Sequence, residues 1–321
     1  MDELLRYILI FIGLLVAELI YFRVAAHYGI VDRPSERGSS TRVTLRGGGI
    51  IFFIGVIAYA VIYQSSYWAF FVGLTAVALV SFIDDVHSLP PKVRLLTQLT
   101  ALALLLWQIG LFSQSYWIWI PVALFVCGGI INIFNFMDGI NGITGGYALV
   151  IIASLIYVEF KVVDFVSPSF LIVTMLSVLV FCFFNFRKTA KCFAGDVGSV
   201  SIAFILLFFM GLLVMKTHDF SWFIFMVVYG VDGVLTIFHR IMMHEKLTQP
   251  HRNHAYQIMA NELAIPHTVV SLLYLALQAL ACVIYFWQPG YLTFLAFIII
   301  YSIAYVIFMS KFFYLHKRAI K

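Results

Sequence analysis

The chain has 321 residues, of which 63% are hydrophobic and 11% are charged, and its formal net charge at pH 7 is +5. Soluble globular domains carry about 25% charged residues, so this composition excludes a protein whose whole surface faces water. The basic residues form no long tract, which excludes a nucleic-acid-binding surface.

Apolar residues gather in eleven stretches, each near the roughly 20 residues that a helix needs to cross the hydrocarbon core of a bilayer. The stretches are 4–22, 48–64, 67–83, 93–110, 117–136, 143–160, 169–186, 197–215, 221–239, 267–287 and 290–310. They are too long for barrel strands and lack their alternation. We predict an all-α polytopic membrane protein of about eleven transmembrane helices, forming a single domain over residues 1–321.

Lys and Arg are divided unevenly between the two sides that this arrangement defines. Seventeen lie on one side and three, Arg6, Lys161 and Lys216, lie on the other. Because basic loops stay in the cytoplasm, we expect the N-terminus outside and the C-terminus inside. The four cysteines are far apart, which predicts neither a disulfide nor a cysteine metal cluster.

Unusual polar residues fall at the predicted cytoplasmic ends, and the first group follows the first span. The loop 32–49 is rich in arginine, ending with Arg46 before three glycines. Phosphate binding and membrane topology both explain such a loop.

Asp84 and Asp85 end the third span. Adjacent carboxylates repel each other at a membrane boundary, so they suit Mg²⁺ or a general base, although a solvated helix end also explains them. Lys92 and Arg94 follow, either to steer phosphates or to anchor the next span.

Asn132, Asn135 and Asp138 recur every three residues at the end of the fifth span, before a glycine-rich turn. Three amide or acid groups on one helix face suit hydrogen bonding to a nucleobase or ribose. A capped helix end is the alternative.

Asn185 ends the seventh span, and Asp196 stands where the eighth begins. Asp196 is a plain helix cap or part of a site. The basic residues between them attract phosphate or set topology.

The longest inner loop holds His251, Arg252 and His254 after Pro250. A helix starting at Pro250 would place the two histidines on one face. Imidazole and guanidinium suit a pyrophosphate; half of a zinc site and an ordinary exposed helix are the alternatives.

Taken in order, these groups resemble the polyprenyl-phosphate N-acetylhexosamine-1-phosphate transferase superfamily over residues 32–257. The form HRNHAYQ is closer to its surface-polysaccharide-initiating branch, which includes enzymes that start O-antigen in lipopolysaccharide biosynthesis. Asn141 and Ser40 depart from the usual pattern, since many relatives have Asp and His there.

The resemblance implies a role for each group. Catalytic residues would be Asp84, Asp85, Asp196, His251 and His254. Substrate-binding residues would be Arg46, Lys92, Asn135, Asp138, Asn185 and Arg252. Asp196 with Asp85 would hold Mg²⁺, with Mn²⁺ as the alternative ion.

The implied reaction moves a sugar-1-phosphate from a UDP-N-acetylhexosamine, by default UDP-GlcNAc, onto undecaprenyl phosphate in the bacterial inner membrane. Asp84 would act as base or order the nucleophile, and a route through a phospho-aspartate is left open, as is a homodimer. A flippase or transporter of anionic lipid-linked sugars is the rival class. A CDP-alcohol phosphotransferase is disfavoured, because Asp138-Gly139 lacks that family's following Ala-Arg.

Overall fold

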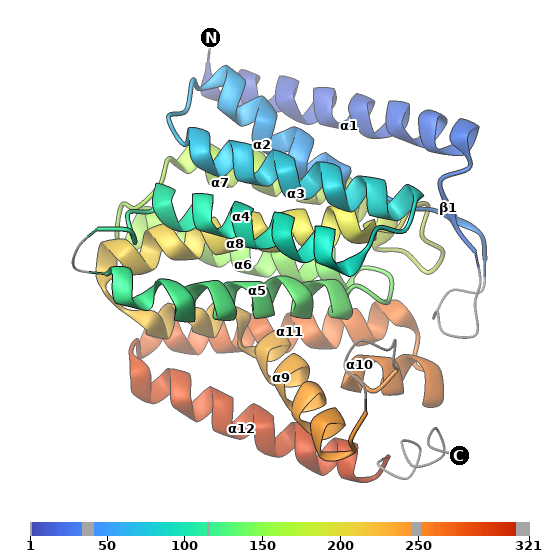
Figure 1. The fold of residues 1–321 in the computed structure, drawn as a ribbon, viewed down its shortest axis with the longest axis vertical. Coiled ribbons are helices and arrows are strands. Elements are labelled where there is room, and N and C mark those ends of the chain that lie inside the picture. Colours follow the sequence, from blue (N-terminus) through green and yellow to red (C-terminus); the bar gives the residue numbers. More distant parts are fainter. Residues whose placement is uncertain (1, 34–41, 114–115, 246–251, 313–321) are drawn as a thin grey trace.

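The computed structural model describes residues 2–33, 42–113, 116–245 and 252–312. Each of the eleven predicted stretches is helical in it (Figure 1). The helices are α1 Glu3–Tyr28, α2 Ile50–Ile62, α3 Trp68–Val86, α4 Pro91–Gln108, α5 Ile120–Met137, α6 Ile143–Lys161, α7 Pro168–Asn185, α8 Gly195–Thr217, α9 Val227–Met242, α10 Ala255–Gln257, α11 His267–Trp287 and α12 Tyr291–Ser310.

Short elements complete the described chain. The 3₁₀ turn η1 (Trp117–Trp119) leads into α5, the 3₁₀ segment η2 (Phe220–Met226) leads into α9, and the π turn η3 (Ile258–Glu262) follows α10. Strands β1 (Val31–Asp32) and β2 (Thr44–Leu45) pair antiparallel.

Within the described residues, nine helical segments are long and apolar enough to cross a membrane. Of the other two predicted spans, α2 has only 13 residues, and α4 carries Lys92 and Arg94 in its first turn. The all-α polytopic membrane fold is therefore confirmed, while the number of crossings and their direction stay predictions.

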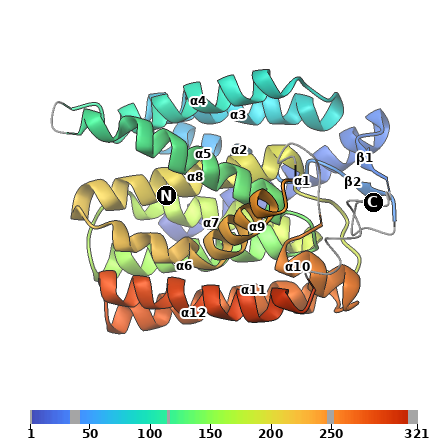
Figure 2. The same cartoon turned by 60° about the horizontal axis from the view of Figure 1, so that its bottom comes forward.

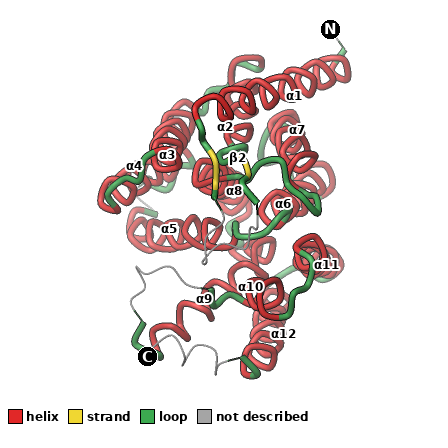
Figure 3. The backbone as a smooth tube through the Cα atoms, turned by 90° about the vertical axis from the view of Figure 1, so that its right-hand side faces the viewer, coloured by secondary structure: helices red, strands yellow, loops and turns green. Residues whose placement is uncertain are grey.

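The long helices run side by side, and α8 lies in their middle (Figures 2 and 3). Most of α8 is buried inside the protein, and it packs against α2, α3, α5 and α6. A helix that is apolar on every face needs such a position. Helix α9 is the exception to the parallel arrangement, because it crosses the others obliquely in Figure 1.

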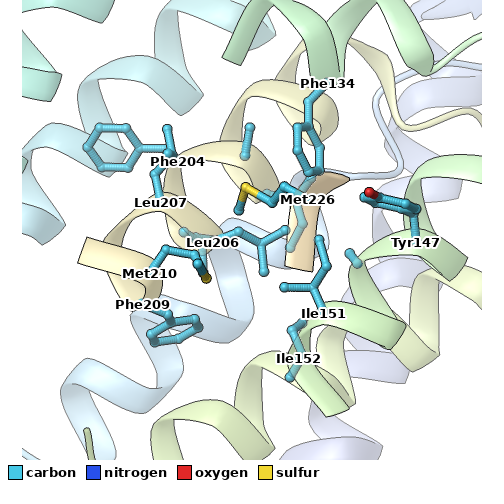
Figure 4. Close-up of a cluster of buried hydrophobic side chains, with 14 of the residues drawn as sticks. Phe134, Tyr147, Ile151, Ile152, Phe204, Leu206, Leu207, Phe209, Met210 and Met226 are labelled. Atoms are coloured by element: carbon cyan, nitrogen blue, oxygen red, sulfur yellow. The ribbon is translucent and has the colours of Figure 1, made fainter. Parts of the chain in front are cut away.

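The core between α5, α6, α8 and η2 is built of large side chains. Phe134, Tyr147, Leu206, Met210 and Met226 meet there (Figure 4). This packing fixes the distance between α5 and α8, whose ends carry Asn135 and Asp196.

Tryptophans lie at the helix ends remote from those polar residues. Trp68 begins α3, which ends with Asp84 and Asp85; Trp287 ends α11, and Trp107 lies in the last turn of α4. All three are exposed, as are Trp117 and Trp119 of η1. Tryptophan is enriched at membrane–water interfaces, so this end of the bundle has the character of an interface.

Candidate active site

The end of the bundle that carries β1 and β2 is built around the start of α8 (Figure 3). The amide of Gly49 donates to the carbonyl oxygen of Ala194 at 3.1 Å. A Cβ on Gly49 would lie 2.3 Å from the Cα of Gly198, so only glycine allows the two backbones to meet here. This contact places Arg46, three residues earlier, beside the first turn of α8.

Asp85 caps the first turn of α8 from the neighbouring helix α3. Its carboxylate accepts the backbone N–H groups of Asp196 at 2.9 Å and Val197 at 3.0 Å. The first N–H groups of a helix have no partner within the helix, so a side-chain acceptor stabilises them. Arg46 Nε also contacts Asp85 Oδ1 at 2.7 Å. Both oxygens of Asp85 are thus engaged by protein groups.

Asp196 lies between two guanidinium groups. Its Oδ1 is 3.6 Å from Nη2 of Arg46, and its Oδ2 is 3.8 Å from Nη1 of Arg94. Asn135 Nδ2 donates to Oδ1 at 3.2 Å. The side chain keeps 23% of its surface exposed, whereas that of Asp85 keeps none. Asp196 is therefore the carboxylate of this cluster that remains open to a ligand.

Asp84 is held by Arg94, which also contacts Asp196. Its Oδ2 accepts from Arg94 Nη1 at 2.9 Å, and its Oδ1 accepts the amide of Leu89 at 2.6 Å. The predicted Asp-Asp pair therefore splits into one carboxylate that caps α8 and one that orients Arg94. This contact brings Arg94 into the cluster. The sequence predicts only that Arg94 steers phosphates or anchors the next span.

A polar cavity of about 230 Å³ opens in front of Asp196. It is lined by predicted site residues and by others that sequence reasoning missed. The predicted ones are Arg46, Asn135, Asp138, Asn185 and Asp196; those without a predicted role include Asp32, Phe193, Ser199 and His267. Ser199 lies one helical turn after Asp196, a spacing from which it could have been found.

Burial and neighbouring charges shift the pKa values of the ionisable groups that line the cavity. Burial, and then the charges of Asp196 and Asp85, raise the pKa of Asp138 to about 7. Burial also raises the pKa of Asp32, and the nearby Arg46 limits that rise. Burial alone would lower the pKa of Arg46, but the surrounding carboxylates, led by Asp85, hold it above its usual value.

Asn185 braces the wall of this cavity. Its Oδ1 accepts the amide of Gly142 at 2.7 Å, and its Nδ2 donates to the carbonyl of Cys192 at 2.8 Å. Asn141 makes a second link, donating from Nδ2 to the carbonyl of Arg187 at 2.9 Å. Both amides therefore join the turn after α5 to the loop after α7, and both also line the cavity.

A second cavity of about 400 Å³ continues from the first. The two share Asn141, Phe193 and His267, and the second adds Arg42 and Lys188. The two cavities together are lined by polar and basic side chains, and Phe193 lines both of them. Such a lining suits an elongated anionic ligand.

His254 lies in a different place from that predicted. Helix α10 begins at Ala255 with His254 as its N-cap, so the predicted helix from Pro250 is wrong over residues 252–254. The His254 ring is buried, and its Nδ1 lies 3.0 Å from Asp232 Oδ1 of α9. Asp232 also accepts from Tyr274 at 2.5 Å. His254 does not line the polar cavity.

The remaining predicted residues lie at the start of α4, before α10, or outside the described residues. Lys92 is exposed in the first turn of α4, and Arg252 is half-buried before α10; neither lines the cavity. His251 and Pro250 fall outside the described residues. The segment after Arg252 is joined to the site through Tyr256, which donates to the carbonyl of Phe136 at 2.7 Å.

The donor set fits Mg²⁺ better than zinc. In the described part of the chain, no three His, Cys, Asp or Glu side chains converge as a metal group. Mg²⁺ usually binds one or two carboxylates together with water and substrate phosphates, not a dedicated cage. Asp196, open to the cavity and flanked by the amide of Asn135, provides such a carboxylate. Asp85, the other predicted ligand, is fully buried, and its two oxygens already accept the amides of Asp196 and Val197 and contact Arg46.

An apolar cavity of about 360 Å³ is also lined by α5. Its walls come from α5, η2, α9 and α12, and include Phe134, Tyr229, Val234 and Phe294. Phe134 is the neighbour of Asn135 in sequence, so one helix lines both the apolar and the polar cavity.

Comparison with known proteins agrees with this chemistry. Residues 67–216 match the family described as Glycosyl transferase family 4. The chain is 29% identical to a probable undecaprenyl-phosphate N-acetylglucosaminyl 1-phosphate transferase of Bacillus subtilis, over 79% of this chain and 77% of that protein.

Two further relatives are matched over less than two thirds of their own length. A decaprenyl-phosphate N-acetylglucosaminephosphotransferase of Mycolicibacterium smegmatis is 30% identical over 61% of this chain and 57% of that protein. A phospho-N-acetylmuramoyl-pentapeptide-transferase of Lactobacillus helveticus is 27% identical over 57% of this chain and 66% of that protein. The names of the first two relatives give N-acetylglucosamine as the sugar, whereas the name of the third gives an N-acetylmuramoyl-pentapeptide.

Proposed function

We propose, from the premise that this chain belongs to the polyprenyl-phosphate N-acetylhexosamine-1-phosphate transferase superfamily, that it transfers N-acetylhexosamine-1-phosphate from a UDP-sugar to undecaprenyl phosphate. The products are undecaprenyl-diphosphate sugar and UMP. UDP-GlcNAc is the default donor, in keeping with the name of the Bacillus subtilis relative. The product would initiate a cell-envelope polysaccharide.

One observation carries the proposal: helix α5 lines a polar cavity and an apolar cavity within two turns of its C-terminal end. Asn135 and Asp138 belong to the first, and Ile133 and Phe134 to the second. A reaction between a water-soluble sugar nucleotide and a lipid phosphate needs two such compartments that meet at the reacting groups.

The donor fits the polar side. Asn135 and Asp138 offer an amide and a carboxyl group for hydrogen bonds to ribose or base, and Phe193 lies between the two polar cavities. Arg46 lines the cavity beside Asp196, where a guanidinium fork can bind phosphate oxygens in pairs. Lys92 and Arg252, which do not line the cavity, would attract the anionic donor through their positive charge.

The acceptor fits the apolar side. An isoprenoid chain has no polar group before its phosphate, and the walls of the cavity between α5, α9 and α12 are almost wholly apolar. The phosphate would then leave this cavity around the end of α5 to reach Asp196.

The reaction is a single displacement at phosphorus. An oxygen of the lipid phosphate forms a bond to the phosphorus next to the sugar, the bond from that phosphorus to the UMP oxygen breaks, and UMP leaves with the electron pair. The lipid phosphate is already largely ionised near neutral pH, because its second pKa is about 6. Asp84 therefore orders the nucleophile more than it deprotonates it, and the guanidinium of Arg94, which contacts Asp84 at 2.9 Å, adds positive charge beside it.

Mg²⁺, or Mn²⁺, bound at Asp196 would neutralise the pyrophosphate and its developing charge. Arg46 and Arg94 add fixed positive charge on either side of Asp196. Asp85 holds the turn that carries Asp196, and Asn135 orients the carboxylate of Asp196.

The site would face the cytoplasm of the bacterial inner membrane. The distribution of Lys and Arg supports this orientation, and the exposed tryptophans lie at the opposite helix ends. A transporter would place its polar binding residues near the middle of the membrane, on interrupted helices. Here the polar cavity lies at the helix ends, which favours the enzyme over the flippase.

The test is UMP release by purified protein in detergent with undecaprenyl phosphate, Mg²⁺ and a panel of UDP-N-acetylhexosamines. We expect UMP only when the lipid acceptor is present. The UDP-sugar that supports UMP release identifies the sugar that is transferred. Asp196→Asn should abolish release while the protein keeps its thermal unfolding profile. Absence of UMP with every donor, from folded protein, would overturn the proposal and favour transport.

A further inference from the structure

The helix that carries the wall of the apolar cavity is broken inside the predicted membrane span. Residues 220–242 form one apolar segment, but η2 ends at Met226 and α9 starts at Val227. Met226 leaves the helical region, with φ −125° and ψ 13°. A helix that starts anew exposes N–H groups without partners in its first turn, which is unfavourable in an apolar interior.

Two buried side chains from other helices supply the missing acceptors. Gln278 Oε1 of α11 accepts the amide of Val228 at 3.3 Å, and the Tyr147 hydroxyl of α6 accepts the amide of Tyr229 at 3.2 Å. Tyr147 in turn donates to Gln278 Oε1. Gln278 Nε2 donates to the carbonyl of Ile224 at 2.9 Å, on the η2 side of the break.

Gln278 therefore forms hydrogen bonds to the chain before and after the break, and Tyr147 adds a further hydrogen bond to the chain after it. Both side chains are completely buried. Figure 4 shows Tyr147 beside Met226 within the core, and the Tyr147 ring stacks on that of Tyr229 with centroids 3.7 Å apart. Polar groups are unfavourable at such depth unless they are paired, and these are paired to the break itself.

The break sets the direction of α9 and hence the shape of the apolar cavity. Met226, Val227 and Tyr229, on both sides of the break, line that cavity together with Val234 farther along α9. Helix α9 leaves the break obliquely, and α12 packs against it (Figure 1). A continuous helix over 220–242 would follow a different path past α5.

We propose that Gln278 and Tyr147 are positioning residues for the acceptor: they hold the break at Met226 and thereby keep the apolar cavity open to the isoprenoid chain. The inference rests on the proposed function for the identity of the occupant. It concerns neither the donor side nor the acidic cluster, since both residues lie outside the polar cavity.

The kinetic test compares Gln278→Leu with Gln108→Leu. Gln108 of α4 is a matched control, because its Oε1 also accepts a backbone amide at a helix start, that of Ala69 at 3.0 Å, and it does not line the apolar cavity. We expect Gln278→Leu to raise KM for undecaprenyl phosphate about tenfold, equivalent to about 1.4 kcal/mol, with KM for the UDP-sugar unchanged. Gln108→Leu should change neither.

Two further variants separate positioning from loss of fold. Tyr147→Phe removes one acceptor and should raise the acceptor KM by a smaller factor, and Gln278→Glu, which keeps an acceptor oxygen, should restore part of the loss. The preference for undecaprenyl over farnesyl phosphate should shrink in Gln278→Leu. An equal rise in both KM values, or the same effect from Gln108→Leu, would overturn the proposal.

A distance measurement tests whether Gln278 holds the break and the direction of α9, and it does so even if the proposed reaction is wrong. Spin labels at Phe125 of α5 and Phe238 of α9, both exposed, report the separation of the two helices by electron paramagnetic resonance. Cys127, Cys182 and Cys192 would be replaced, and the buried Cys282, which contacts Gln278, retained. Gln278→Leu should shift or broaden the distance distribution; an unchanged distribution would overturn the proposal whatever the substrate.

Discussion

The sharpest prediction separates the two aspartates that the sequence assigns to the same metal. Asp85→Asn should lower the stability of the protein without removing its response to Mg²⁺ and donor, whereas Asp196→Asn should do the reverse. The reason is the geometry: Asp85 caps α8 through two amides and meets Arg46 at 2.7 Å, while Asp196 faces the cavity.

The magnitude follows from the contacts that the amide loses. Asparagine keeps one acceptor oxygen, so one of the two capping bonds and the charge on the other are lost. A hydrogen bond to a charged group contributes about 1.5–3 kcal/mol, and loss of a cap costs about 0.5–2 kcal/mol. Arg46 keeps a third of its side chain exposed, which reduces the ion-pair contribution. We expect a loss of about 3 kcal/mol for Asp85→Asn.

The assay is unfolding in detergent micelles, followed with and without Mg²⁺ and UDP-GlcNAc. Asp85→Asn should unfold earlier but gain the same stabilisation from the ligands as the wild type. Asp196→Asn should unfold near the wild type and gain nothing. Unchanged stability of Asp85→Asn together with loss of its ligand response would refute the reasoning and make Asp85 a metal ligand.

Three further predictions concern other parts of the chain. Without ligands, thermal stability should fall as pH rises from the ordinary Asp138 pKa of 3.8 through about 7, because the folded state holds a proton that the unfolded chain releases. Asp138→Asn should make this slope shallower in melting curves, and Asp196, whose pKa burial and then Asp85 raise to about 6, accounts for part of what remains. A double-mutant cycle of Asp232→Asn and His254→Phe should give a coupling energy of about 1–3 kcal/mol in unfolding measurements, and additive effects would contradict the buried pair. Gly230→Trp, where a side chain meets open space beside the apolar cavity, should raise the acceptor KM in steady-state assays, unlike Gly129→Trp on an exposed part of α5.

The helices were predictable because each needs only local information. An apolar run of about 20 residues is enough to predict a membrane helix. Pro91 and Pro168 lie in the first turns of α4 and α7, where proline is favoured. The positions of Asn135, Asp138 and Asp196 at helix ends predicted only that they lie on one side of the membrane, and the family resemblance implied a shared site; in the structure all three line one cavity.

The division of roles within the site was not predictable, because it depends on which side chain reaches which partner. Asp84 and Asp85 are neighbours in sequence, yet one orients Arg94 and the other caps a helix more than a hundred residues away. His254 shared a motif with Arg252 but is turned into the core by Asp232. Sequence spacing contains no information about these long-range contacts.

The polar residues inside the spans carry a related lesson about membrane enzymes. In a bilayer, a bent helix needs acceptors for its freed amides, and those acceptors must come from other helices. Gln278 and Tyr147 do not line the polar cavity. Their polar groups are needed because they accept the free amides in the first turn of α9. For a polar residue inside a membrane span, the first question is therefore whether it bonds to a break in a neighbouring helix. Asp232 differs, because the α9 around it is regular and its partners His254 and Tyr274 come from elements near the site. Its charge therefore acts on the loop that carries Arg252, whereas Gln278 acts on the path of α9, and the two should affect donor and acceptor separately.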